Sequence, residues 1–385
     1  MGKTEMENFI VSARKYRPGT FDTVVGQSHV TNTLKNAIKN NHLAQAFLFC
    51  GPRGVGKTTC ARILAKTINC QNLQPNIEPC NECDSCRAFN ESHSFNIYEL
   101  DAASNNSVDD IRGLVEQVRY APQGAKYKIY IIDEVHMLSS AAFNAFLKTL
   151  EEPPPYAIFI LATTERHKIL PTILSRCQIF DFKRIQIQDI SNHLQSIAQK
   201  ENISADPLAL HIVAEKADGA LRDALSIFDQ MVSFGGNTLT YDGVIENLNI
   251  LDYDYYFKVT DAINNENVPL ALNLYNEILE KGFDGLVFLE GLALHFRNLL
   301  VCKDPNTLKL LQVADNVKEK YSTQATITDT GILFNALNLA TQAEVGYKAS
   351  RNQRLHVELA LIKMCLIPQA IKIDAGIEAP KKKMI

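Results

Sequence analysis

The sequence has no run of about 18 apolar residues, the length at which a segment becomes a candidate membrane-spanning helix. Its N-terminus also lacks the apolar core of a signal peptide. The formal net charge of −4 gives no overall basic signal, so any surface for nucleic acid must be local. Internal repeats and low-complexity tracts are absent too. We therefore expect a cytoplasmic protein with no membrane partner.

The chain also lacks the cysteine content of a small disulfide-rich protein. It has nine cysteines in 385 residues, an odd number, and disulfide frameworks are expected mainly in small secreted domains. We expect reduced thiols. Cys70, Cys80, Cys83 and Cys86 form a C-x9-C-x2-C-x2-C quartet. The remaining cysteines are scattered, and most are expected to be small buried hydrophobes: Cys50, Cys60, Cys177, Cys302 and Cys365.

The quartet has the spacing of a metal site. Thiolates two residues apart can share one ion, and Cys70 would supply the fourth ligand of a closed tetrahedral Zn²⁺ site. The last three cysteines also resemble the start of a ferredoxin run, but residues 87–90 offer neither a further cysteine nor the proline that such a run needs. Structural zinc is therefore favoured over an iron–sulfur cluster, a redox pair or unliganded thiols. With four thiolates bound, no coordination position is open for catalysis.

Short apolar segments alternate with helical segments from residue 46 to about residue 182. Such alternation predicts an α/β domain with a parallel sheet and helices on both faces. The expected strands are residues 46–50, 96–100, 128–132, 157–162 and 178–182.

After about residue 184 the pattern changes to helices only, with apolar residues at helical spacing. One expected stripe consists of Leu355, Leu359, Ile362 and Leu366. The predicted domains are an α/β P-loop domain over 1–184 with a zinc module at about 70–86, a small helical lid domain over 185–245, an all-α domain over 246–370, and a tail or the start of a linker over 371–385.

A phosphate-binding motif lies between an expected strand and an expected helix. Residues 51–58 match G-x4-G-K-[ST] in full. Glycines let the backbone N–H groups face the β-phosphate, Lys57 would reach the β- and γ-phosphates, and the Thr58 hydroxyl would ligate Mg²⁺. A glycine-rich turn that binds nothing is the disfavoured alternative. The expected nucleotide-binding residues of this segment are Gly51, Pro52, Arg53, Gly54, Val55, Gly56, Lys57, Thr58 and Thr59.

The second half of the expected site follows the apolar residues 129–132. Asp133 would hold the Mg²⁺ water shell, and Glu134 would orient or deprotonate the attacking water. An acidic helix cap is the simpler alternative, but the P-loop favours hydrolysis. Residues 133–136 also spell the DExH box of superfamily 2 helicases. Such a helicase needs a second RecA-like domain, and the helical remainder shows no second parallel-sheet pattern.

Further motifs occur in a fixed order between residues 14 and 225. They are residues 14–18 with 21 and 24–27, the P-loop, the quartet, and residues 99–105, 133–138, 161–164, 175–177 and 219–225. On these segments the chain resembles the gamma/tau subunits of the bacterial DNA polymerase III clamp loader, a family of AAA+ ATPases, and the resemblance covers essentially the whole chain. The resemblance implies that the adenine pocket is walled by Tyr16, Arg17, Pro18, Val24 and Val25, although this arm could simply pack on the core.

The resemblance also implies roles for three residues outside the P-loop. Thr164 corresponds to sensor 1, at a strand tip near the γ-phosphate, and Arg222 corresponds to sensor 2 on the lid. Arg176 corresponds to an arginine finger that completes a neighbour's site in trans, so the subunit alone should be nearly inactive. The simpler alternatives are that Arg176 only caps a helix or contacts phosphate nearby, and that Arg222 forms a surface salt bridge.

The function implied by the resemblance is that of an ATP-hydrolysing motor in a five-subunit ring or spiral of clamp-loader subunits. With ATP, Mg²⁺ and Zn²⁺ as cofactors, it would load the ring-shaped sliding clamp onto primer–template DNA, mainly through backbone contacts. It would belong to the replisome at the nucleoid and to the DNA-directed DNA polymerase holoenzyme, without being the polymerase itself. Residues 246–370 would form the oligomerising collar, and a longer form would reach polymerase and helicase.

Two other classes are less expected. A branch-migration ATPase should lack the zinc insertion and carry a DNA-binding winged helix. A non-hydrolysing structural subunit should have lost Lys57 or Glu134, and both are present. The quartet is then a structural or partner-facing insertion. We expect Cys83→Ser to destabilise this module while leaving nucleotide affinity nearly intact.

Overall fold

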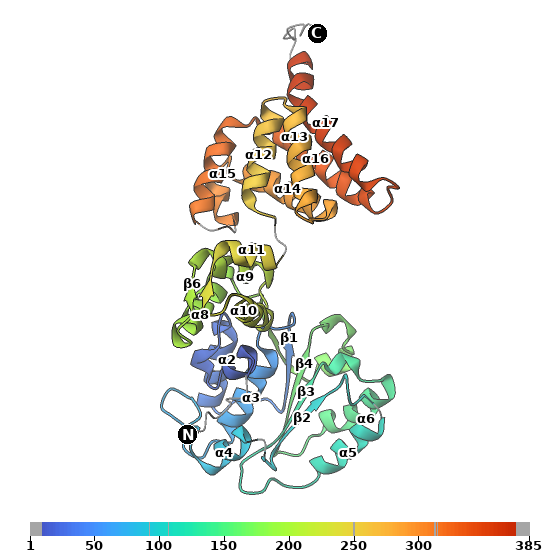
Figure 1. Cartoon of the computed structure of the whole chain (residues 1–385). Helices are drawn as coiled ribbons and strands as arrows, with labels where there is room; N and C mark the ends of the chain where they lie inside the picture. Colours follow the sequence, from blue (N-terminus) through green and yellow to red (C-terminus); the bar gives the residue numbers. More distant parts are fainter. Residues whose placement is uncertain are drawn as a thin grey trace, which may run out of the picture. The chain divides into compact units, whose positions relative to one another are not determined.

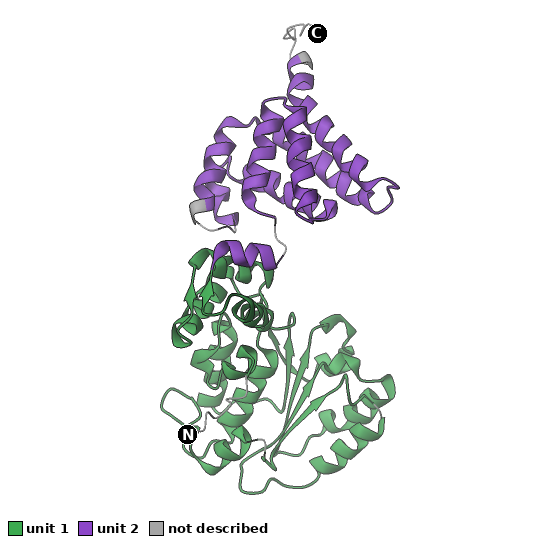
Figure 2. Ribbon diagram, viewed as in Figure 1, with its two compact units in different colours: residues 1–239 green, residues 240–385 purple. Residues whose placement is uncertain are grey.

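The computed structural model describes residues 10–374 except 92, 107, 249, 250, 312 and 314. The chain divides into two compact units, residues 1–239 and 240–385 (Figure 2). In the described ranges, no helix combines the length and the apolar character that crossing a membrane requires. Residues 375–385 of the predicted tail lie outside the described residues. The predicted boundaries near 184, 245 and 370 stay predictions.

Five parallel strands form the main sheet of the first unit, in the order β2-β3-β4-β1-β5 (Figure 1). The five predicted strands are confirmed, and each end lies within one residue of its predicted position. The strands are β1 Ala46–Cys50, β2 Ile97–Asp101, β3 Lys128–Asp133, β4 Ala157–Thr163 and β5 Gln178–Asp181.

Both faces of this sheet are buried, because alternate strand residues enter two separate cores. Phe47 and Phe49 pack in one core with residues of α2 (Ser28–Lys39) and α3 (Lys57–Ile68). Leu48 packs in the other core with residues of α5 (Val108–Val118) and α6 (Ser140–Glu151). The shorter helices of this region are α1 Ser12–Lys15, η1 Phe21–Thr23, α4 Asp84–Asn90, η2 Val135–Met137, η3 Arg166–Lys168 and α7 Pro171–Leu174.

The rest of the first unit is almost entirely helical. Its elements are α8 Ile187–Lys200, β6 Ser204–Ala205, α9 Pro207–Lys216, α10 Leu221–Gly235 and β7 Thr238–Leu239. The expectation of helices only is wrong here, because β6 and β7 pair in parallel. Each strand has two residues, too few for a detectable alternation of apolar and polar side chains.

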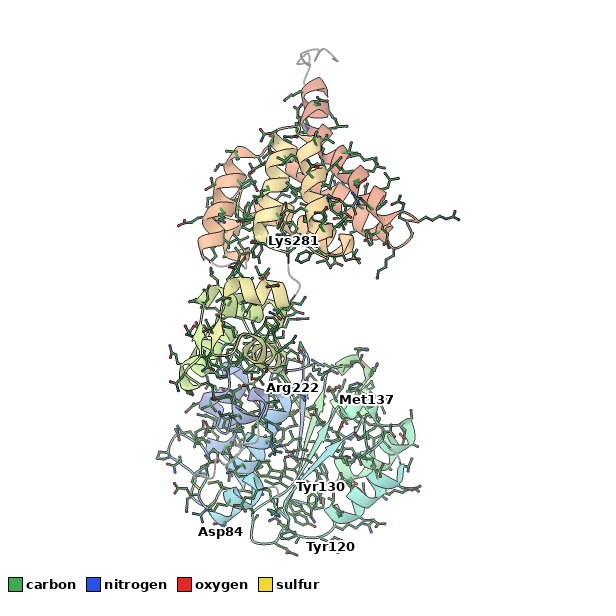
Figure 3. All side chains as sticks on the ribbon, viewed as in Figure 1. Asp84, Tyr120, Tyr130, Met137, Arg222 and Lys281 are labelled. Atoms are coloured by element: carbon green, nitrogen blue, oxygen red, sulfur yellow. The ribbon has the colours of Figure 1, made fainter. Side chains whose placement is uncertain are left out.

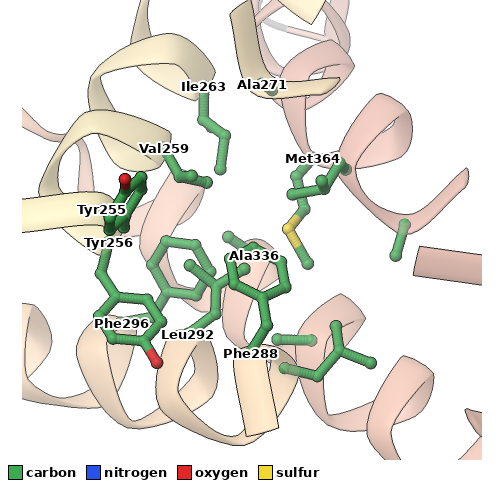
Figure 4. Packing of buried hydrophobic residues seen from close by; sticks show 14 of the residues in the cluster. Tyr255, Tyr256, Val259, Ile263, Ala271, Phe288, Leu292, Phe296, Ala336 and Met364 are labelled. Carbon is green, nitrogen blue, oxygen red and sulfur yellow. The ribbon is translucent and has the colours of Figure 1, made fainter. Parts of the chain in front are cut away.

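The second unit contains helices packed around one core, part of which is shown in Figure 4. Tyr256 of one helix stacks on Phe288 of another with ring centroids 6.2 Å apart, and Met364 belongs to the same cluster. The elements are α11 Tyr241–Asn247, α12 Tyr253–Asn264, α13 Val268–Glu280, α14 Gly285–Val301, η4 Pro305–Leu310, α15 Asp315–Ile327, α16 Thr330–Tyr347 and α17 Gln353–Asp374.

Helix α17 turns a different face to the core from the one predicted. Leu355, Leu359 and Leu366 are 56%, 47% and 45% exposed. The buried residues of this helix are Val357, Ala360, Leu361, Met364, Cys365, Ile367 and Pro368. Two apolar stripes run along the helix, and spacing alone does not tell which one is buried. The stripe predicted a helix, which is confirmed, but its leucines do not form the core face.

Candidate active site

A cavity of about 740 Å³ lies in the first unit, at the ends of β1 and β3. Most of the residues predicted to bind nucleotide line it. They are Tyr16, Arg17, Pro18, Val24, Val25, Arg53, Gly54, Val55, Gly56, Lys57, Thr58, Thr59, Asp133, Glu134 and Arg222. The predicted residues outside this lining are Gly51, Pro52, Thr164 and Arg176.

Glycine is required at several points of the loop between β1 and α3. Gly54 and Gly56 have φ values of +77° and +103°, in the region that side chains disfavour. A Cβ on Gly51 would lie 2.5 Å from the carbonyl oxygen of Phe182, so the loop packs closely against the chain after β5. A Cβ on Gly56 would meet no atom within 4 Å. The backbone at Gly56 is therefore open to a ligand.

Lys57 begins α3 and is buried, with 6% of its surface exposed. Its Nζ donates to the carbonyl oxygens of Gly51 and Pro52 at 2.9 and 2.7 Å. Burial lowers the pKa of Lys57, and the nearby carboxylates of Glu134 and Asp133 oppose this effect. The ammonium group is thus held against the loop that forms the cavity wall.

The two predicted Mg²⁺ ligands are in contact. Thr58 Oγ1 donates to Asp133 Oδ2 at 2.6 Å. The other oxygen of Asp133 accepts the backbone N–H of Glu134 at 3.0 Å. A hydroxyl and one carboxylate suit Mg²⁺, which keeps several waters and shares its remaining positions with phosphate oxygens. These residues fit a magnesium ion bound together with a nucleotide.

Glu134 occupies a tight turn directly after β3. Its φ of +47° lies in the left-handed region, which is uncommon for a residue other than glycine. Glu134 Oε2 accepts from the backbone N–H and the hydroxyl of Thr164 at 3.2 and 3.0 Å. The structure therefore places Thr164 beside Glu134 and outside the cavity lining.

His136 is a neighbour of Glu134 that the sequence reasoning did not select. Its Nδ1 lies 3.4 Å from Glu134 Oε2 and 3.0 Å from Thr163 Oγ1. Its Nε2 lies 3.2 Å from Glu165 Oε2. The side chain is largely buried, so the imidazole bridges the ends of β3 and β4. The signal that could have identified it was its place in the 133–136 segment.

The N-terminal arm contacts both the P-loop and the region after residue 184. Arg17 Nε donates to Thr59 Oγ1 at 3.3 Å, and the Tyr16 hydroxyl bonds to Glu201. Burial lowers the pKa of Arg17, and the nearby Arg62 adds to this effect. Gln27 is fully buried and donates to the carbonyl oxygen of Lys183 at 2.6 Å.

Residues of α10 and of the segment before α8 close the cavity. The backbone N–H of Arg222, which is labelled in Figure 3, donates to the carbonyl oxygen of Gly54 at 3.3 Å. This hydrogen bond fixes the start of α10 on the P-loop. Several lining residues were not assigned a role from sequence, although Arg14, Asp101, Ala103, Leu221 and Leu225 lie inside the motif segments. The lining residues without an assigned role are Val11, Ala13, Arg14, Asp101, Ala103, Ile185, Leu221 and Leu225.

Arg176 follows α7 and lies outside the cavity lining. Its guanidinium donates to Glu151 Oε1 at 2.7 Å and to the carbonyl oxygen of Thr172 at 2.6 Å. The side chain is partly exposed. A role for Arg176 in a neighbouring subunit's site stays a prediction.

The cysteine quartet forms a compact cluster whose four sulfur atoms lie within 4.8 Å of one another. Cys80 Sγ lies 3.5 Å from Cys70 Sγ and 4.0 Å from Cys86 Sγ. Zn–S bonds of ~2.3 Å place the sulfurs of a tetrahedral site at similar separations. Burial opposes ionisation of Cys80, but hydrogen bonds from the N–H groups of Glu82 and Cys83 and from the thiols of Cys70 and Cys83 together lower its pKa to about 6. The cluster fits a structural Zn²⁺ ion.

Two family models match successive parts of the chain. The model described as "DNA polymerase III, delta subunit" matches residues 26–186. The model described as "DNA polymerase III clamp loader subunit, ATPase lid domain" matches residues 189–237.

Among solved structures, the Thermotoga maritima RuvB Holliday junction branch migration motor has 20% identity and a TM-score of 0.46, over 64% of this chain and 79% of that chain. This structural likeness is too weak to bear on function.

Similarity over more than nine-tenths of this chain is found among curated proteins. DNA polymerase III subunit gamma of Buchnera aphidicola subsp. Baizongia pistaciae is 33% identical over 93% of this chain and 97% of that protein. Subunit tau of Bacillus subtilis is 42% identical over 91% of this chain and 62% of that protein. Subunit tau of Escherichia coli is 39% identical over 92% of this chain and 55% of that protein. The chain thus spans little more than half the length of these tau subunits, and it belongs to the gamma/tau family of DNA polymerase III clamp loader subunits.

Proposed function

We propose that the chain is an ATP-binding and ATP-hydrolysing motor subunit that loads a ring-shaped sliding clamp onto primer–template DNA during chromosomal replication. The observation that carries this proposal is the convergence of Lys57, Thr58, Asp133 and Glu134 on one cavity. These are the groups that phosphoryl transfer to water requires: a cation for the phosphates, ligands for Mg²⁺, and a carboxylate for the water. Bound Mg²⁺ would neutralise charge on the phosphate oxygens.

Each protein group has a part in this proposal. Lys57 exchanges its two loop carbonyl partners for phosphate oxygens, and the N–H groups around Gly56 face the same phosphates. Glu134 orients the attacking water, and Thr164 holds its carboxylate in place. Tyr16, Arg17, Pro18, Val24 and Val25 form the adenine side of the cavity, and Arg222 approaches the phosphates from the lid.

The assembly belongs to the proposal as well. Arg176 would act in trans on a neighbour's nucleotide within a five-subunit ring or spiral, with residues 246–370 as the collar. The quartet would hold Zn²⁺ as a structural ion. In the cytoplasmic replisome the subunit would contact the other clamp-loader subunits, the clamp and DNA. Family membership supports these partners, and a longer form would add polymerase and helicase.

An ATPase assay of the purified chain, alone and with partner subunits, clamp and primed DNA, tests the proposal. We expect a low rate for the chain alone and a large stimulation when all components are present. Lys57→Ala should abolish nucleotide binding. Glu134→Gln should keep binding and reduce turnover about a hundredfold or more. High basal hydrolysis that no partner changes would overturn the clamp-loader assignment.

A further inference from the structure

Glu78 lies in the loop between the first two cysteines of the quartet, and only 4% of its surface is exposed. It is the only acidic residue that is buried among those whose exposure the structure describes. A buried carboxylate is unfavourable unless charged and hydrogen-bonding partners compensate for its lost hydration. The partners of Glu78 therefore indicate why it is there.

These partners belong to the N-terminal arm and to α2. Glu78 Oε2 accepts the backbone N–H of Phe21 at 2.8 Å, and Oε1 accepts the N–H of Asp22 at 2.9 Å. The Nζ atom of Lys35, on α2, lies 2.6 Å from Oε1. A second residue of the same loop, Asn76, donates to Asp22 Oδ2 at 3.4 Å. The loop of the cysteine module is thus bonded to the turn η1.

The turn η1 leads directly into the cavity wall. The backbone N–H of Val24 donates to the carbonyl oxygen of Phe21 at 3.2 Å. Val24 and the next residue, Val25, line the cavity. Phe21 itself is buried in the same core as residues of α3. Glu78 therefore holds the backbone directly before Val24 and Val25, two residues of the proposed adenine wall.

The loop that presents Glu78 has an unfavourable backbone. Ile77 has a φ of +63°, which is a strained conformation for a β-branched residue. The backbone N–H of Gln74 donates to the carbonyl oxygen of Glu78 at 3.0 Å and closes the turn. Cys70 and Cys80 flank this loop, so a metal bound to both would close its ends. The metal would keep the strained turn in place.

A second contact fixes the module to the helix that carries the phosphate-binding residues. Lys66 of α3 is buried, and its Nζ donates to Asn81 Oδ1 at 2.6 Å and to Asn90 Oδ1 at 3.3 Å. Asn81 lies between the second and third cysteines, and Asn90 ends α4. The cysteine module is therefore hydrogen-bonded both to α3, through Lys66, and to the turn η1, through Glu78.

We propose that Glu78 is a positioning residue for nucleotide binding, through which the metal-bound quartet supports the adenine side of the cavity. The proposal rests on the proposed function of the cavity as an ATP site. It departs from the expectation that loss of a quartet cysteine leaves nucleotide affinity nearly intact. Base recognition, and not phosphate binding, should depend on the quartet.

The test compares two ligands on the full chain. ATP and inorganic tripolyphosphate, each with Mg²⁺, are titrated by calorimetry into the wild type and into Glu78→Ala, Glu78→Gln, Glu91→Gln and Lys57→Ala. Glu91 is an exposed acid at the end of α4 and serves as the charge-matched control. Zinc content and thermal unfolding are recorded for each variant. Glu78→Gln keeps the side-chain shape and covers the case in which Glu78→Ala does not fold.

We expect Glu78→Ala to weaken ATP binding about tenfold, or about 1.4 kcal/mol, and to leave tripolyphosphate binding unchanged. Glu78→Gln should show a smaller loss with the same selectivity, and Glu91→Gln should match the wild type. Removal of zinc with a chelator should weaken ATP binding by the wild type. It should cause little further loss in Glu78→Ala, because both changes remove the same support from the adenine side of the cavity.

Two results would overturn the proposal. One is wild-type ATP affinity in a folded, zinc-loaded Glu78→Ala or Glu78→Gln variant. The other is an equal loss of ATP and tripolyphosphate binding. Failure of the ATP site itself has a different signature: the wild type would bind neither ligand, or Lys57→Ala would bind both as well as the wild type.

Discussion

Thr164 donates two hydrogen bonds to the same oxygen atom of Glu134, one from its backbone N–H at 3.2 Å and one from its hydroxyl at 3.0 Å. The two residues follow β4 and β3, which are adjacent strands of the sheet. A carboxylate bound in this way has a fixed direction relative to the cavity. The residue expected to sense nucleotide is thus bonded to the residue expected to orient water.

The first prediction concerns the hydroxyl of Thr164. Thr164→Val keeps the backbone hydrogen bond and the side-chain shape but removes the second hydrogen bond to Glu134. We expect turnover of ATP in the reconstituted complex to fall about tenfold, or ~1.4 kcal/mol in activation free energy. The dissociation constant for ATP should stay the same. Thr164→Ser is the control and should retain most of the activity. Weaker ATP binding with unchanged turnover would contradict this role.

The second prediction concerns His136, which bridges Glu134 and Glu165. His136→Ala should lower turnover about three- to tenfold, because the Glu134 carboxylate loses one of the groups that orient it. ATP affinity should not change, since the imidazole is not part of the cavity lining. His136→Gln can still donate toward Glu134 and should lose less. Equal turnover of the alanine variant and the wild type would exclude a positioning role.

The third prediction separates a cis role from a trans role for Arg176. Arg176→Ala breaks an exposed ion pair with Glu151, which should change the free energy of unfolding by less than about 1 kcal/mol. Complexes made with Arg176→Ala alone, or with Glu134→Gln alone, should be nearly inactive. Mixed complexes should regain part of the activity, because an intact site can then meet an intact arginine. Without any recovery in the mixture, the trans assignment fails.

The fourth prediction concerns the pH dependence of the second unit. His295 is buried, with Nδ1 3.0 Å from the Tyr321 hydroxyl and Nε2 3.2 Å from Gln324 Oε1. Burial lowers its pKa to about 3, below the usual 6.5 of an unfolded chain. Between pH 3 and pH 6.5 this histidine is protonated in the unfolded state but neutral in the folded state. The free energy of unfolding should therefore fall as the pH drops below about 6.5.

Between pH 7 and pH 5 this group alone should lower the free energy of unfolding by about 2 kcal/mol. Hydrogen exchange of the backbone amides in α14 provides the measurement. His295→Gln cannot titrate, so its exchange-derived stability should change less over the same range. A variant that loses as much stability as the wild type would assign the pH dependence to other groups.

Local motifs were enough to predict one part of the site. Lys57, Thr58 and Asp133 could be assigned from sequence because each lies a fixed distance from the end of a strand or the start of a helix. Ile185 gave no such signal, because it reaches the cavity only after the chain has left the sheet. Glu78 was also missed, since its partners are 57 and 56 residues away in the sequence.

The strands of the sheet could be predicted from the sequence, but the buried face of α17 could not. The strands of the sheet were found because their apolar runs are short and separated by helices. In α17 the exposed leucines and the buried Leu361 lie on different stripes of comparable hydrophobicity. Which stripe is buried depends on the neighbouring helices, and these are fixed only by the tertiary structure.

The left-handed backbone of Glu134 has a consequence for how this position can vary. This conformation costs a residue with a Cβ atom roughly 1 to 2 kcal/mol, and glycine would adopt it without strain. Folding stability alone would therefore favour glycine here. The carboxylate is kept at this position against that preference, so the turn after β3 is a place where the stability of the subunit and its proposed chemistry are in opposition.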